Sequence, residues 1–128
     1  MKVNVASQRD DAIRMFIAQA EKDLANGYRV IVGGDFNEPS HRDWIEKNKN
    51  LYDHNGFVVP WTVTTLLEEA GFIDSYRKIY PNPLTHPGFT YPSDNLAETP
   101  EKITWAPKAD ERDRIDFIFY KGKGLKAK

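Results

Sequence analysis

The sequence predicts an α/β (α+β) fold in which helices flank a sheet. Residues 7–24 place apolar side chains at the spacing of one helical face, and Asn26-Gly27 supplies a stop signal. Residues 28–32 form a short apolar run that predicts a buried strand leading into a polar loop. Residues 114–120 alternate two sets of side chains, which predicts a second strand. A helix, a strand and then a polar loop are typical of α/β proteins, whose functional groups follow the carboxyl end of a strand.

The remaining elements are shorter and are predicted from capping and turn residues. Ser7 can cap the first helix, with Asp10 placed to complement its exposed amides. Downstream, a short helix is expected near 42–47, followed by a surface loop. A second helix starts at Thr65 or nearer Thr62 and ends at Gly71, and a third runs from Asp74 to Tyr80. Brief strands are expected at 88–91 and 103–105. The basic tail, residues 121–128, is expected to fray.

Composition sets broad limits on the protein class. The chain has 128 residues, enough for a single domain or a half-domain spanning 1–128, and a net charge of -1 that does not favour nonspecific nucleic-acid binding. It contains no cysteine, which excludes disulfides and thiolate zinc sites. It has no apolar run of the ~20 residues that a membrane helix needs, and no signal peptide. We therefore expect a soluble protein, and a secreted or periplasmic parent stays open.

The first candidate site follows the predicted strand at 28–32. Gly33 and Gly34 allow a close backbone approach, and Asp35 and Asn37 then present an acid and an amide two residues apart. The structural alternative is an Asx turn, which aspartate and asparagine both favour.

The second candidate is Asp116, an acid inside an otherwise apolar strand. A buried carboxylate needs a partner, and Arg112 or Arg114 could serve as a structural one. The functional alternative is that Asp116 orients a histidine, as carboxylates do in hydrolytic sites.

Taken together, these segments resemble the endonuclease/exonuclease/phosphatase (DNase I-like) superfamily, in its C-terminal part. The resemblance covers nearly the whole chain and rests on several segments in the family's order, namely Gly34-Asp35-Phe36-Asn37, Gly71 to Arg77, His86-Pro87-Gly88-Phe89-Thr90-Tyr91, and Asp113 to Phe119. The stretch 37–44 resembles a bacterial-type branch of the family.

The resemblance implies a parent with a four-layer α/β sandwich, mostly antiparallel, of which this chain supplies about one sheet. It implies a phosphoester hydrolase, either a phosphodiesterase or nuclease or a phosphatase, that uses Mg²⁺ or Mn²⁺. Asp35 would position or deprotonate the attacking water, Asn37 would hold the phosphate or a metal-bound oxygen, and Asp116 would orient the catalytic histidine. Asp35 and Asn37 are also candidate metal contacts. The alternative function is a non-catalytic phosphate- or protein-binding module that keeps the fold.

The resemblance also implies that part of the site lies outside this chain. The family's metal-binding glutamate precedes the matched region, and its Asp-His pair follows it, so the isolated chain is expected to be inactive. His41, Phe89 and Tyr91 are candidate substrate contacts, with a solvated His41 as the alternative. The substrate would be nucleic acid, a phospholipid head group or a small phosphorylated metabolite. A half-sandwich should self-associate or pair with the missing half through an apolar face, for which Ile115, Phe117 and Phe119 are the candidates.

Overall fold

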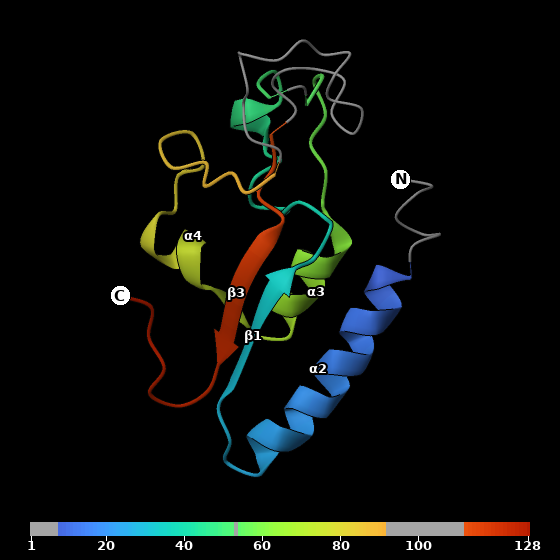
Figure 1. Cartoon of the computed structure of the whole chain (residues 1–128), viewed down its shortest axis with the longest axis vertical. Coiled ribbons are helices and arrows are strands. Elements are labelled where there is room, and N and C mark those ends of the chain that lie inside the picture. The colour runs from blue at the N-terminus through green and yellow to red at the C-terminus, as the bar shows by residue number, and fades with distance from the viewer. Residues whose placement is uncertain (1–7, 53, 92–111) are drawn as a thin grey trace.

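The computed structural model of the chain describes residues 8–52, 54–91 and 112–128. Its helices and strands, in chain order, are α2 (Arg9–Ala25), β1 (Val30–Asp35), the 3₁₀ helix η1 (Glu46–Asn48), α3 (Thr62–Glu69), β2 (Ile73–Asp74), α4 (Ser75–Ile79) and β3 (Asp116–Lys121). The strands form an antiparallel sheet of order β1-β3-β2. Figure 1 shows β1 beside β3, with α4 on the far side of β3 from β1. The α/β prediction is thus confirmed.

Helix α2 forms where the apolar period predicts it. Ile13 and Ala20 are buried, and Phe16 and Ile17 pack against the core. The helix ends as expected, because Gly27 adopts a φ of 86° and the Tyr28 amide returns to the Asp23 carbonyl at 3.0 Å. The residue before the helix is Gln8, which makes no side-chain cap, and the predicted cap at position 7 lies outside the described residues.

The hydrophobic core lies between the helices and one face of the sheet. Phe117 and Phe119 of β3 are 4% and 1% exposed, and they pack with buried residues of α2 and α3 and with Phe72. The predicted association face, residues 115, 117 and 119, is therefore wrong, because these side chains are buried within the chain. The opposite face carries Ile31 and Ile118, which are 64% and 57% exposed.

Other differences from the sequence predictions concern short elements. The strand predicted at 28–32 begins two residues later and is not buried, because only one of its faces is covered. The helix predicted near 42–47 is only η1, and β2 was not predicted. Tyr91 forms a single bridge with Asp113 in place of a strand at 88–91, and the strand predicted at 103–105 lies outside the described residues.

Two helix starts lie where the sequence predicted them, although Trp61, before α3, makes no side-chain cap. Helix α3 starts at Thr62, the second of the two expected positions, and the Asp74 side chain accepts the Arg77 amide at the start of α4. The tail after β3 is held against the fold, since Arg29 Nε donates to the Lys123 carbonyl at 2.8 Å and the Ala127 amide donates to the Tyr120 hydroxyl at 3.2 Å. Within the described ranges, no helix is long and apolar enough to cross a membrane.

Candidate active site

The sheet brings the two predicted carboxylates together. In the β1–β3 register, Asp35 lies directly opposite Asp116, Gly33 opposite Ile118, and Ile31 opposite Tyr120. Residues that face each other across an antiparallel pair point to the same side of the sheet. Asp35 and Asp116 therefore share the face that the helices leave uncovered, and both residues are exposed.

A tight turn fixes the relation between Asp35 and Asn37. The Asn37 amide donates to Asp35 Oδ1 at 2.8 Å, and Asn37 adopts a left-handed φ of 51°. The Asx turn that was the structural alternative is therefore present. It is compatible with a functional role, because one carboxylate oxygen orients the turn while both residues stay exposed at the end of β1.

The Thr90 side chain fixes the backbone at Asp116. The Thr90 hydroxyl oxygen accepts the amides of both Ile115 and Asp116, at 3.0 and 3.2 Å, at the start of β3. Sequence reasoning missed Thr90, although it lies in one of the segments that carry the family resemblance. Asp116 was expected to be a buried carboxylate paired with Arg112 or Arg114. Its burial is wrong, because Asp116 is exposed, and the Arg114 guanidinium binds other acids.

Near the start of β3 lies a buried network of Arg114, Arg77, Asp43 and Asp74. Arg114 donates to Asp43 at 2.8 and 3.2 Å and to Asp74 at 3.0 and 2.7 Å. Arg77 Nε donates to Asp43 Oδ1 at 2.7 Å. Burial alone would lower the pKa of Arg114, but its hydrogen bonds to Asp74 and Asp43 outweigh burial and raise that pKa above its ordinary value.

The network also fixes the loop that carries Thr90. The remaining donors of Arg77 bind carbonyls of Tyr80, His86 and Pro87, at 3.1, 2.6 and 2.9 Å. A single buried guanidinium thus determines the path of the chain from α4 toward Thr90. Sequence reasoning identified Asp74 as a cap but missed its pairing with Arg114, because the partners are 40 residues apart.

Each of the three predicted substrate contacts has a partner of its own in the fold. The His41 ring binds α3, with Nδ1 2.8 Å from Thr64 Oγ1 and Nε2 2.8 Å from Glu68 Oε2. Phe89 packs edge-on against Tyr52, with ring centroids 4.7 Å apart, and Tyr91 forms the bridge to residue 113. None of the three lines the pocket that contains Asp116, although Thr90, which lies between Phe89 and Tyr91 in the chain, does.

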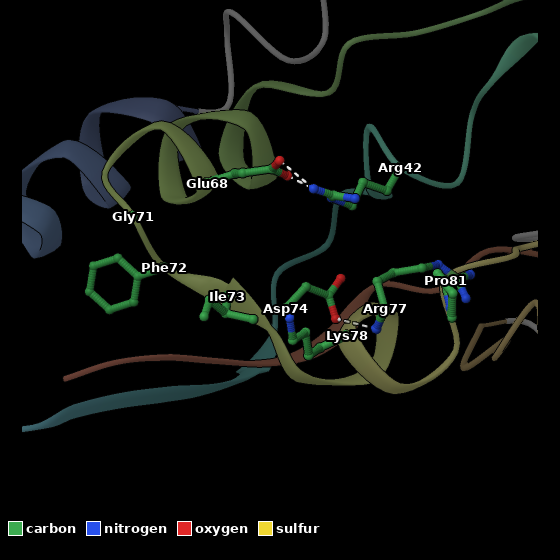
Figure 2. A pocket seen from close by; sticks show the side chains of 9 residues that line it. All are labelled: Arg42, Glu68, Gly71, Phe72, Ile73, Asp74, Arg77, Lys78 and Pro81. Carbon is green, nitrogen blue, oxygen red and sulfur yellow. Dashed lines mark hydrogen bonds and ion pairs between the residues drawn. The ribbon is translucent and has the colours of Figure 1, made fainter. Parts of the chain in front are cut away.

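Two open pockets flank β2 and α4. The first, of about 790 Å³, lies on the uncovered side of β3 and is lined by Gly34, Thr90 and Asp116 at one end and by Tyr76, Ile79, Tyr80 and Ile118 beyond them. The second pocket, of about 490 Å³, lies between the end of α3 and α4. Its lining includes the Arg42–Glu68 ion pair (Figure 2). The lining of the pocket that contains Asp116 thus combines charged residues, which include Arg114 and Lys128, with aromatic and aliphatic side chains.

None of the three histidines of the chain lines the pocket that contains Asp116. His41 binds α3, His54 stacks on Trp44 with centroids 3.9 Å apart, and His86 stacks on Tyr80 at 4.5 Å. A histidine oriented by Asp116 would have to come from outside this chain.

Comparison with known proteins gives two matches. A family model described as the Endonuclease/Exonuclease/phosphatase family matches residues 3–128. The Caenorhabditis elegans protein named "Uncharacterized protein F14F9.5" is 44% identical over 93 residues, which is 73% of this chain and 28% of the relative. This chain thus spans less than a third of that relative's length. No solved structure gives a significant match.

Proposed function

Because the chain belongs to the endonuclease/exonuclease/phosphatase family, we propose that it forms part of a metal-dependent phosphoester hydrolase. The observation that carries the proposal is the pairing of Asp35 with Asp116 across β1 and β3. Two exposed carboxylates share one sheet face, and the Asn37 backbone amide binds one of them, so they supply part of the groups that phosphoester hydrolysis needs. Such a reaction requires an aligned water and donors to the phosphoryl oxygens.

The chain's own residues take distinct roles in this proposal. Asp35, whose carboxylate is oriented by the Asn37 amide, accepts a proton from the attacking water and aligns it with the phosphorus. The Asn37 side chain donates to a phosphoryl oxygen. Asp116 orients a histidine that the rest of the protein supplies, so the isolated 128-residue chain should turn over phosphoesters slowly or not at all.

The donor chemistry of the site suits Mg²⁺ or Mn²⁺. These ions prefer oxygen ligands, and Mg²⁺ is often held by one or two carboxylates, with waters and substrate phosphate completing the shell. Asp35 and Asn37 provide oxygen donors of that kind. In the described part of the chain no group of three acidic, histidine or cysteine side chains could hold an ion, so further ligands would come from elsewhere in the protein. When bound, the ion would neutralise charge on the phosphate.

The uncovered face of the sheet supports a second element of the proposal. Ile31 and Ile73 flank Tyr120 in the strand register, and Ile118 lies on the same face. We infer that this apolar surface packs against a further sheet of the complete protein, which would place the missing site residues next to Asp35 and Asp116. A second copy of the chain would cover the same face when the chain is isolated.

The substrate is expected to be nucleic acid, a phospholipid head group or a small phosphorylated metabolite. A panel of these three classes, tested with the complete protein and Mg²⁺ or Mn²⁺, would identify which is hydrolysed. Binding of phosphate ligands without turnover of any of them would favour the alternative function, a non-catalytic binding module.

The Asp116→Asn variant of the complete protein tests the assignment of this residue. Asp116 is exposed and its side chain is not part of the Arg114 network, so the variant should keep its melting temperature. Turnover should nevertheless fall by roughly two powers of ten, because the histidine loses its charged partner. A drop in melting temperature with unchanged turnover per folded molecule would instead identify Asp116 as a structural residue.

A further inference from the structure

The loop that follows β1 is anchored to helix α3 at both of its ends. Directly after Asn37, the Glu38 side chain is 1% exposed and its Oε1 accepts the Val63 amide in the first turn of α3, at 3.3 Å. At the other end, the His41 amide donates to Thr64 Oγ1 at 3.0 Å. The short segment between these two contacts has little freedom to move away from α3.

Glu68 is the centre of the second anchor. It lies one helical turn after Thr64, so both side chains project from the same side of α3. His41 Nε2 lies 2.8 Å from Glu68 Oε2, and Arg42 Nε donates to the same oxygen at 2.7 Å. A second nitrogen of Arg42 donates to Glu68 Oε1, which makes the pair bidentate (Figure 2).

The anchored loop begins next to Asn37. Asn37 adopts a left-handed φ of 51°, which asparagine tolerates better than most residues with a side chain, and it directly precedes the segment that is anchored to α3. The same backbone conformation places the Asn37 amide on the Asp35 carboxylate. A change in the loop would therefore alter the direction of both candidate site residues.

We propose that Glu68 is a positioning residue, which acts through His41 and Arg42 to hold Asn37 and the Asp35 carboxylate in place. This inference rests on the proposed function only in taking Asn37 as a site residue. It also assigns His41 a role other than contact with substrate, because both of its ring nitrogens are engaged with α3.

The test is a measurement of backbone order parameters in the ¹⁵N-labelled chain. We expect Asn37 to be rigid in the unsubstituted chain, with an order parameter of about 0.85, and to fall below about 0.6 in E68A. The matched control is E69A, which removes the neighbouring, exposed acid from the same helix end and should leave Asn37 unchanged. E68Q, which keeps the shape of the side chain, provides a milder variant if E68A does not fold, and should lie between the two.

Three results would overturn the proposal. Asn37 could stay rigid in both Glu68 variants, it could loosen equally in E69A, or Phe119 in the middle of β3 could loosen as much as Asn37. The last result would show that Glu68 only stabilises the whole fold. Because the readout is loop order and not turnover, a failure of the proposed function would appear separately, as unchanged turnover in Asp35→Asn.

Discussion

Replacing Arg114 by methionine should strongly destabilise the fold. Arg114 is 3% exposed and donates four hydrogen bonds, two to Asp43 and two to Asp74. Methionine fills part of the space but leaves two buried carboxylates with fewer donors. In this variant Asp43 still accepts a hydrogen bond from Arg77 Nε, and Asp74 still accepts one from the Arg77 backbone amide. The two carboxylates therefore lose most of their hydrogen-bond donors, but not all of them.

Breaking a buried ion pair by removing one partner typically costs about 3–5 kcal/mol. Most domains have only about 5–15 kcal/mol of unfolding free energy. For a chain of this size we therefore expect the melting temperature to fall by roughly 10–20 °C. Urea unfolding followed by far-ultraviolet circular dichroism would measure the change in free energy.

The matched control is Arg14→Met, which removes an exposed arginine from α2 and should change the unfolding free energy by less than about 0.5 kcal/mol. The double variant Arg114→Met with Asp74→Asn should be less destabilised than the sum of its single variants, because the second change removes a carboxylate that the first leaves poorly paired. A loss below about 1 kcal/mol in Arg114→Met, or strict additivity in the double variant, would refute the network's proposed contribution.

The remaining predictions concern Glu68 and the uncovered sheet face. The pKa of Glu68 is lowered, chiefly by its hydrogen bond from Arg42, so its contribution to stability is present above the unfolded pKa and is lost as the pH falls through the folded one. Glu68→Gln should therefore cost at most about 1 kcal/mol at pH 7, because the pair is solvent-screened, and a difference from the unsubstituted chain that persists at pH 2 would contradict this. The isolated chain should self-associate in sedimentation velocity through its uncovered sheet face. Ile31→Lys, on that face, should weaken the association, whereas Met15→Lys, on α2, should not. A monomer at every concentration would count against an apolar docking face.

Local patterns predicted the long elements well. Helix α2 and strand β3 carry enough residues for a helical period or an alternation to emerge. Gly27 marks the end of α2 and Asp74 the start of α4 by their own chemistry. Strand β2, with two residues, is too short to show a period. Its strand conformation comes from pairing with β3, which no local pattern records.

The alternation in β3 identified two faces but could not say which face the helices cover. Phe117 and Phe119 fill the core beneath α2 and α3, while Ile118 lies on the uncovered side with Ile31. The prediction that β1 is buried was wrong for the same reason. An apolar run in the sequence does not show whether one face of a strand or both faces are covered.

The candidate site was predictable only in part. Local patterns marked Asp35, Asn37 and Asp116 as candidates, and the family resemblance gave them their expected roles. The register then explains why Asp35 and Asp116, 81 positions apart, face each other. The Arg114 network was not found, because Asp43 and Arg114 are 71 residues apart and nothing local marks them as partners. Glu68 binds the loop that carries Asn37 through Arg42, a residue 26 positions away that no local pattern marks as its partner.

The most direct test of the account is the Mg²⁺-dependent turnover of a phosphoester by the complete protein and its Asp35→Asn variant. We expect hydrolysis that stops when the metal is chelated, and that falls by roughly two or more powers of ten in Asp35→Asn. The melting temperature of the variant should stay within about 2–4 °C of the unsubstituted protein, because Asp35 is exposed. Full turnover in Asp35→Asn, or no hydrolysis of any phosphoester by the complete protein, would contradict it.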